Sequence, residues 1–238
     1  MTLSVVVFQH DPYDGPGYLG EALLRRGASL TIIRLDNGEI VPDISAHDML
    51  LVMGGSMNVY QEDKYPWLAE ETRAIRRAVD GGKAVMGVCL GGQLLAKALD
   101  ARVRLGVATE IGLVPIMLTE AGKADPLFEG LSKVEAVEWH DDTFDIPSGA
   151  VALARSEGCA HQAFRFGERA YGLQFHPEVS PAMLADWINA ASNLPSGRSD
   201  FQHIVAAKAD VLQAQADRLI ENFIRACIPF ASLRLHHD

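Results

Sequence analysis

One cysteine between an apolar run and a helical pattern is the feature that most constrains this chain. Residues 83–88 (KAVMGV) form a short, mostly apolar run, Cys89 follows at once, and residues 90–95 (LGGQLL) begin a helical pattern. This order predicts a strand, a sharp turn and a helix, with the thiol at the turn. Gly87 and Gly91 flank the turn, as a strained backbone with close neighbours requires. The sequence therefore predicts a strand–turn–helix unit of an α/β fold.

The predicted position of Cys89 favours a reactive thiolate. A helix N-terminus offers unpaired N–H groups and a partial positive charge. Both favour the thiolate, which is the nucleophilic form of cysteine. By analogy, the nucleophile elbow of α/β-hydrolases places a serine on the same kind of turn. The alternative is a buried core cysteine that behaves as a small hydrophobic residue.

A second segment supplies a candidate base. Residues 171–178 (YGLQFHPE) read as an apolar strand that runs into His176, Pro177 and Glu178. Residues two apart on a strand point to the same face, so His176 and Glu178 can lie side by side. A histidine oriented by a carboxylate and aimed at a cysteine is the logic of a catalytic triad. The alternative is a strand-end histidine with an incidental acid nearby.

Three motifs resemble those of the class I (triad) glutamine amidotransferases. Residues 87–93 (GVCLGGQ) are similar to the family's G-x-C-x-G-x-Q nucleophile motif, and residues 175–178 to its F-H-P-E motif. Residues 54–60 (GGSMNVY) resemble the glycine loop that supplies part of the oxyanion hole. The three motifs also occur in the family's order. Within the family, residues 139–144 (WHDDTF) make the chain most similar to stand-alone GMP-synthase-like amidotransferases.

The resemblance implies a Cys-His-Glu triad and an oxyanion hole. Cys89 would attack the γ-carboxamide carbon of glutamine, His176 would transfer the proton, and Glu178 would hold the imidazole. The backbone N–H groups of Gly55 and Leu90 would stabilise the oxyanion. Ammonia would leave a γ-glutamyl thioester, which water then cleaves.

The same resemblance implies three substrate contacts. Gln93 and Gly54 would lie beside the bound glutamine, and the carboxylate of Glu110 would meet its α-amino group, because an ammonium group prefers a carboxylate partner. Two alternatives stay open. Gln93 is also a plausible polar residue in the first turn of a helix, and Glu110 a plausible solvated loop acid.

Composition excludes several classes of protein. The 238 residues include 21 Lys and Arg against 31 Asp and Glu, a net charge of −10. This balance disfavours binding to nucleic acid or to an anionic membrane through a basic patch. No run approaches the ~20 apolar residues of a membrane span. Three widely spaced cysteines fit neither a disulfide framework nor a metal motif, so a reducing cytoplasm is expected. We expect no metal at residues 140–142 (HDD) and no cofactor elsewhere.

The pattern of runs predicts a three-layer α/β fold of the flavodoxin-like class I amidotransferase type, with a mostly parallel central sheet flanked by helices. Strands are expected at residues 3–9, 30–35, 49–54 and 83–88, and helices at 17–26 and 67–81. A strand-rich part follows, with strands at 112–118, 151–154, 163–166 and 170–175. Because sites in such sheets lie beyond the carboxyl ends of the strands, the glycine loop, Cys89 and His176 should share one edge.

The division predicted for the chain is an amidotransferase domain at 1–190 and a C-terminal helical extension at 191–238 that packs on the same domain. The extension shows a helical repeat of apolar residues, which are Leu212, Ala216, Leu219, Ile220 and Phe223. Residues 193–197 are expected to form the loop before it, and His236 and His237 a frayed tail.

Three functions compete. The first is a glutaminase that passes ammonia to a separate synthetase subunit, since no P-loop signature occurs in the chain. The second is a stand-alone γ-glutamyl peptidase or hydrolase that uses the same triad on γ-glutamyl peptides or conjugates. The third is a non-catalytic module on the same fold, which the presence of all three triad residues disfavours.

Overall fold

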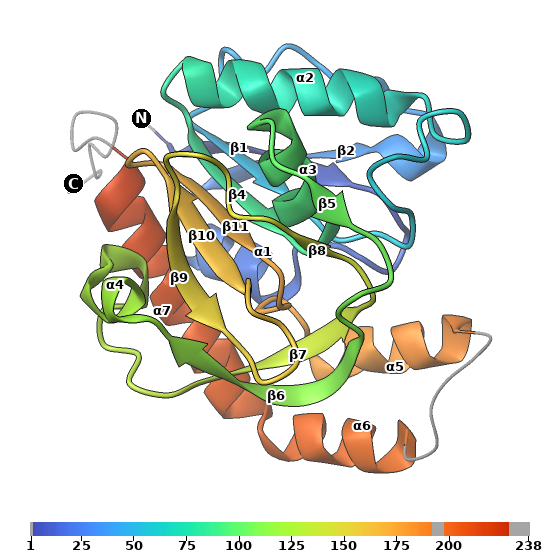
Figure 1. The fold of residues 1–238 in the computed structure, drawn as a ribbon, viewed down its shortest axis with the longest axis vertical. Coiled ribbons are helices and arrows are strands. Elements are labelled where there is room, and N and C mark those ends of the chain that lie inside the picture. The colour runs from blue at the N-terminus through green and yellow to red at the C-terminus, as the bar shows by residue number, and fades with distance from the viewer. Residues whose placement is uncertain (1, 192–197, 229–238) are drawn as a thin grey trace.

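The computed structural model describes residues 2–191 and 198–228, and its centre is a nine-stranded sheet with the order β2-β1-β3-β4-β11-β10-β9-β6-β7 (Figure 1). A separate two-stranded sheet pairs β5 with β8. The strands are β1 (Ser4–Gln9), β2 (Ser29–Arg34), β3 (Met49–Val52), β4 (Ala84–Val88), β5 (Val103–Arg104), β6 (Glu110–Leu118), β7 (Val134–His140), β8 (Thr143–Phe144), β9 (Val151–Arg155), β10 (Ala163–Phe166) and β11 (Ala170–Leu173). The α-helices are α1 (Gly17–Arg25), α2 (Trp67–Asp80), α3 (Leu90–Ala98), α4 (Glu120–Ala124), α5 (Pro181–Ala190), α6 (Arg198–Ala207) and α7 (Ala209–Cys227), and the 3₁₀ turns are η1 (Leu35–Asn37) and η2 (Pro126–Phe128).

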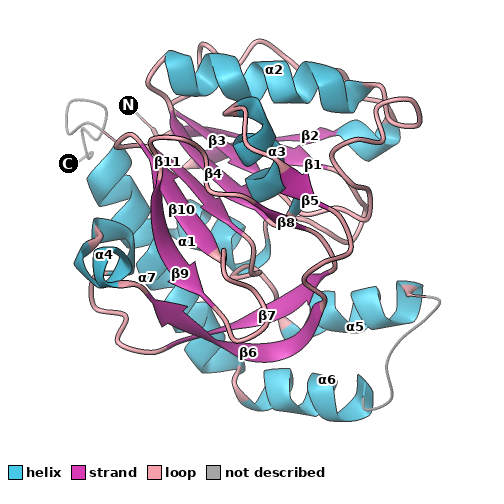
Figure 2. Cartoon of the chain, in the orientation of Figure 1, coloured by secondary structure: helices cyan, strands magenta, loops and turns pink. Residues whose placement is uncertain are grey.

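Helices cover both faces of the parallel part of the sheet (Figure 2). Along β1, Val5 and Val7 pack into one hydrophobic core, with residues of α1 and α7. Val6 and Phe8 point to the opposite face and pack into a second core, with residues of α2 and α3. This alternation explains why residues 5–8 of the strand are all apolar, because both faces of the strand are buried there. The predicted α/β fold, with a mostly parallel central sheet flanked by helices, is confirmed.

Three neighbouring parallel strands bring the conspicuous motifs together. β3 pairs with β4, with Val52 opposite Gly87, and β4 pairs with β11, with Val88 opposite Leu173. The glycine loop therefore follows β3, Cys89 follows β4, and the segment of His176 follows β11 at the same edge of the sheet. This is the arrangement that the strand-end rule predicts.

The other half of the sheet is antiparallel. β10 and β11, both predicted as strands, form a hairpin around residues 166–169, and β9, β6 and β7 continue outward from it. We did not predict β7, which pairs with β6 along its whole length. Its sequence, VEAVEWH, alternates apolar and acidic residues at the start, which is the signal that would have identified it. The short strands β5 and β8 also escaped prediction, because two residues are too few for a recognisable period.

The C-terminal helices contact the body of the protein. The repeat from Leu212 to Phe223 lies on α7, and its residues are buried in the same core as α1. The division at residue 190 stays a prediction. The predicted loop at 193–197 and the tail residues 236–237 lie outside the described residues. None of the helices in the described ranges is both long and apolar enough to cross a membrane.

Candidate active site

Cys89 occupies a strained turn between β4 and α3. Its backbone has φ 50° and ψ −107°, a conformation that costs a residue with a Cβ atom on the order of 1–3 kcal/mol. The surrounding glycines explain how the turn fits. A Cβ atom on Gly87 would overlap the backbone of Gly91, and one on Gly91 would overlap the carbonyl group of Val52. The backbone is therefore packed tightly around the turn, which fixes the direction of the thiol.

The thiol lines a pocket of about 310 Å³ at the end of the parallel strands. Only 7% of Cys89 is exposed, so the sulfur atom is reached through this pocket. The lining residues come from six parts of the chain, and they are Asp11, Tyr13, Asp14, Gly55, Ser56, Cys89, Trp139, His176, Trp187, Ala190 and Ala191.

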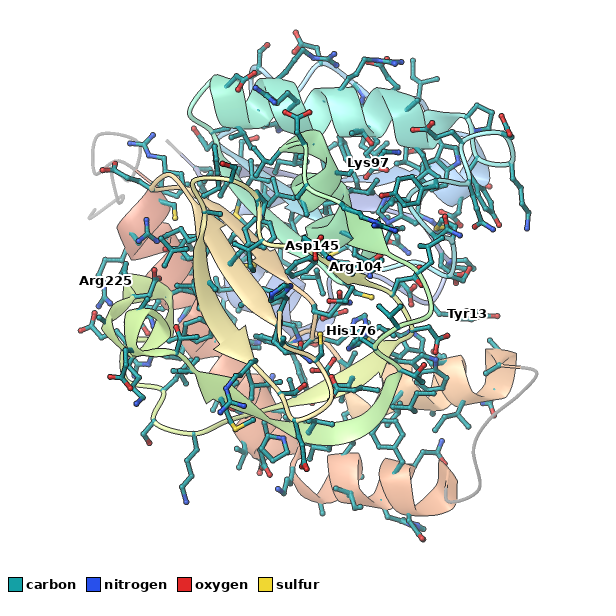
Figure 3. All side chains as sticks on the ribbon, in the orientation of Figure 1. Tyr13, Lys97, Arg104, Asp145, His176 and Arg225 are labelled. Atoms are coloured by element: carbon teal, nitrogen blue, oxygen red, sulfur yellow. The ribbon has the colours of Figure 1, made fainter. Side chains whose placement is uncertain are left out.

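His176 lines the pocket and is hydrogen-bonded to a buried carboxylate. Its Nδ1 lies 2.7 Å from Oε1 of Glu178, which is fully buried, while its Nε2 has no hydrogen-bond partner among the described residues. Burial opposes protonation, but the Glu178 carboxylate and the Cys89 sulfur outweigh it and raise the pKa of His176 well above its usual value. Trp187 packs edge-on against the imidazole at 4.8 Å. Figure 3 shows His176 in the interior of the molecule.

The two residues predicted to supply oxyanion donors lie at the pocket or directly beside Cys89. Gly55 lines the pocket, and Leu90 begins α3 immediately after Cys89. Leu90 is the first residue of its helix and so has no acceptor within it. In the described chain, neither of the two backbone N–H groups donates a hydrogen bond to another loop or side chain. Both are therefore available to an oxygen bound beside Cys89.

Gln93 does not line the pocket, and it is connected to Cys89 through the side chain of Gln174. Its Nε2 donates to the Asp142 carbonyl oxygen at 3.2 Å and to Oε1 of Gln174 at 3.3 Å. Nε2 of Gln174 in turn donates to the Cys89 sulfur at 3.6 Å. We did not single out Gln174 from the sequence, although its position two residues before His176 on an apolar strand was a usable signal.

Asp14 is a second residue that the sequence did not reveal. Asp14 lines the pocket, close to Gly54 and His176. A Cβ atom built on Gly54 would lie 3.8 Å from Oδ2 of Asp14 and 3.1 Å from Cε1 of His176. Within the described ranges, no hydrogen bond or ion pair reaches its carboxylate. Burial, with smaller contributions from Asp11 and Glu178, raises the pKa of Asp14 to about 7. The loop before α1 carries no motif that would have marked this acid.

Glu110 is held away from the pocket in a cluster of its own. Its carboxylate accepts hydrogen bonds from Ser156 Oγ, at 2.7 and 2.8 Å, and from Gln162 Nε2 at 2.8 Å. The structure does not place it beside Cys89, so its contact with a substrate stays a prediction. Potential metal-ligand atoms of Glu110, His140 and Cys159 lie within 4.8 Å of one another, whereas Asp141 and Asp142 do not join them.

Of the predicted site residues, Cys89, His176 and Gly55 line one pocket, and Glu178 lies behind His176 and is hydrogen-bonded to it. Leu90 and Gly54 are the chain neighbours of Cys89 and Gly55. Gln93 reaches the pocket only through Gln174. The arrangement brings together a thiol, an imidazole hydrogen-bonded to a carboxylate, and two backbone N–H groups with no loop or side-chain acceptor among the described residues, which are the kinds of group that acyl transfer uses.

Comparison with known proteins agrees with this geometry. The family model described as glutamine amidotransferase class-I matches residues 18–187. The glutamine amidotransferase-like protein YfeJ of Salmonella typhimurium is 35% identical over 176 residues, which cover 72% of this chain and 74% of that protein. Gamma-glutamyl peptidase 5 of Arabidopsis thaliana is 26% identical over 211 residues, covering 84% and 82%.

A solved structure extends the likeness to the whole fold. The crystal structure of a glutamine amidotransferase from Methylobacillus flagellatus superposes with a TM-score of 0.86 at 28% identity, covering 100% of this chain and 99% of that one. The matched model spans the glycine loop, the cysteine turn and the His-x-Glu segment. The chain belongs to the class I glutamine amidotransferase family.

Proposed function

We propose that the protein is a cysteine-nucleophile amidohydrolase that releases ammonia from the γ-carboxamide of glutamine through a γ-glutamyl thioester. The observation that carries the proposal is the position of His176, which lines the same pocket as Cys89 and whose Nδ1 is held by Glu178 at 2.7 Å, while Nε2 has no hydrogen-bond partner in the described part of the chain. Family membership supports the same chemistry.

In the first step the Cys89 sulfur attacks the amide carbon. The raised pKa of His176 supports a thiolate–imidazolium pair, in which the thiol proton already resides on the imidazole. A C–S bond forms as the C=O π bond breaks and its electrons move onto oxygen, and the N–H groups of Gly55 and Leu90 stabilise the resulting anion. One such donor typically contributes about 10²–10³ in rate.

The tetrahedral intermediate then collapses. The C–N bond breaks, and His176 gives its proton to the departing nitrogen, which leaves as ammonia or an amine. In the second half, His176 takes a proton from water, the hydroxyl adds to the thioester carbon, and the C–S bond breaks. Glutamate is released and the Cys89 thiolate is restored.

Asp14 is the acid that we assign to the ammonium group of the glutamyl substrate. Its carboxylate lies in the pocket with no protein partner in the described chain, whereas both oxygens of Glu110 already accept hydrogen bonds. A half-buried carboxylate with no hydrogen-bond partner is costly to ionise, and a substrate ammonium group would relieve that cost beyond what the nearby His176 does.

A second candidate, a γ-glutamyl peptidase, is favoured by the wall next to His176. Trp139, Trp187, Ala190 and Ala191 form an apolar side of the pocket beside the histidine that protonates the leaving group. An apolar wall binds the remainder of a peptide or conjugate better than it binds ammonia. The relative from Arabidopsis thaliana carries that activity in its name.

One experiment separates the candidates. Purified protein is incubated with glutamine and with a panel of γ-glutamyl peptides, and glutamate release is measured against Cys89→Ala as the blank. Brisk turnover of peptides supports the peptidase. Turnover of glutamine supports the glutaminase. A protein inactive on both, with Cys89 still alkylated by a glutamine-like electrophile, requires a separate synthetase partner. Release that persists in Cys89→Ala contradicts both candidates.

A further inference from the structure

A buried histidine–glutamate pair lies directly behind the loop of Gly54 and Gly55. His10 follows β1 and Glu71 lies on α2, and 1% or less of either residue is exposed. His10 Nδ1 is 2.8 Å from the Gly54 carbonyl oxygen, and His10 Nε2 is 2.8 Å from Oε1 of Glu71. Because a carbonyl oxygen only accepts hydrogen bonds, Nδ1 carries a proton and donates it.

The hydrogen bond from His10 fixes the orientation of a whole peptide unit. The Gly54 carbonyl and the Gly55 N–H belong to one planar trans peptide, so they point in opposite directions. With the carbonyl oxygen directed at His10, the N–H of Gly55 is directed away from His10. Gly55 lines the pocket of Cys89, and its N–H has no acceptor among the described loops and side chains.

Packing prevents His10 from moving away. The imidazole stacks on Trp67 with ring centroids 5.3 Å apart and an angle of 14° between the planes. The loop lies directly on the histidine, since a Cβ atom on Gly55 would be 2.9 Å from the Cβ of His10. Burial opposes protonation of His10, but Glu71 and the Gly54 carbonyl outweigh it and raise its pKa. A protonated ring donates from both nitrogens at once.

We propose that His10, held by Glu71, is a positioning residue that turns the Gly55 N–H toward the substrate and so preforms one donor of the oxyanion hole. The inference rests on the proposed function, because it assigns to these residues the orientation of a group used in that reaction. The orientation is supplied by this chain itself. His10 touches no reacting atom, and its effect passes entirely through the Gly54–Gly55 peptide.

The test compares three variants with the wild type. The double variant His10→Leu/Glu71→Met removes the donor without leaving Glu71 buried and unpaired. His10→Asn, made in the Glu71→Met background so that no buried, unpaired carboxylate remains, keeps a donor, because its amide nitrogen reaches the place of Nδ1. Asp125→Asn is the matched control: Asp125 is also buried and ion-paired, to Arg165 at 2.7 Å, but does not line the pocket.

Steady-state glutamate release gives kcat and KM, and iodoacetamide alkylation of Cys89 reports access to the thiolate without forming an oxyanion. In the double variant kcat should fall about 10²–10³-fold, with KM and the alkylation rate within about twofold of wild type. His10→Asn in the Glu71→Met background should recover most of kcat, and Asp125→Asn should change none of the three. An unchanged kcat in the double variant overturns the inference, as does a parallel fall of kcat, affinity and alkylation.

Failure of the proposed function is recognised separately. If the wild type releases glutamate from no γ-glutamyl compound, the proposed reaction is wrong or incomplete, and the inference is decided from crystal structures. The Gly54 carbonyl should face residue 10 in the wild type and turn away in the double variant. A carbonyl that already faces away in the wild type, or that keeps its direction in the double variant, overturns the inference.

Discussion

The side-chain amide of Gln174 donates a hydrogen bond to the Cys89 sulfur atom, with Nε2 3.6 Å from Sγ. Gln174 is fully buried, and its own Oε1 accepts from Gln93, which is anchored on the Asp142 carbonyl. The nucleophile is therefore connected through two amides to the loop after β7. A donor aimed at the sulfur stabilises a negative charge there more than it stabilises a neutral thiol.

Replacing Gln174 should therefore make Cys89 less reactive. Gln174→Met keeps the length of the side chain and removes the donor, and the hydrogen bond to a charged group is typically worth about 1.5–3 kcal/mol, so alkylation by iodoacetamide at pH 7 should slow at least tenfold. The matched control is Gln162→Met, which removes another fully buried glutamine that bonds to Glu110 and not to Cys89. Equal alkylation rates in the two variants would contradict the role of Gln174.

The backbone of Cys89 predicts a difference between two inactive variants. Cys89→Ala and Cys89→Gly both remove the nucleophile, and neither should release glutamate. Only glycine adopts φ 50° and ψ −107° without steric cost, so Cys89→Gly should be more stable than Cys89→Ala by about 1 kcal/mol, after its greater entropy in the unfolded chain is subtracted. Urea unfolding of both variants measures the difference. A less stable Cys89→Gly would show that the turn stores no strain.

Much of this fold could be predicted from local patterns. The apolar run VVVF indicates a strand with both faces buried, and the glycines around Cys89 indicate a tightly packed turn. Both can be read from the residue types alone. The order of motifs along parallel strands then places Cys89 and His176 at one edge. These features are predictable because each leaves a recognisable pattern within a few residues of sequence.

The remaining features depend on contacts that join distant segments. His10 acts on Gly54 across 44 residues and Gln174 on Cys89 across 85, and no spacing rule connects such pairs. Glu110 was expected at the substrate because a family segment contains it, yet its carboxylate is bound by Ser156 and Gln162. Asp14 lies in an irregular loop whose path is set by tertiary packing. Sequence patterns report a residue's own environment better than they report its partners.

The triad geometry predicts unequal losses from its two supporting members. His176→Ala removes the group that carries the proton, whereas Glu178→Gln keeps a side chain of the same shape beside Nδ1. The loss of kcat in Glu178→Gln should therefore be about 10–100-fold smaller than in His176→Ala. Both variants are compared with the wild type in the glutamate-release assay, with circular dichroism as the check on folding. Activity retained equally by both variants would remove His176 and Glu178 from the mechanism.

The raised pKa of Asp14 predicts that the folded protein is more stable when this carboxyl group is uncharged. The pKa of Asp14 in the folded protein is about 7, above its usual value of 3.8, so the folded protein binds the proton more tightly than the unfolded chain does. The stability that Asp14 contributes is therefore present at low pH and is lost as the pH rises toward and through 7. Asp14→Asn removes this loss, and its free energy of unfolding should exceed that of the wild type above pH 7 by up to about 4 kcal/mol.

Urea unfolding of Asp14→Asn and wild type between pH 5 and 8.5 tests this, and the gap between them should widen with pH. The control is Asp36→Asn, because the hydrogen bond from Arg34 lowers the pKa of Asp36 and the loss of this bond should destabilise the protein at high pH.

The Asp14→Asn variant should also bind its substrate less well, with KM raised at least tenfold and kcat changed little, since a carboxylate–ammonium pair typically contributes about 1.5–3 kcal/mol. A gap that is constant with pH, or an unchanged KM, would mean that Asp14 is not the buried acid that receives the substrate's charge.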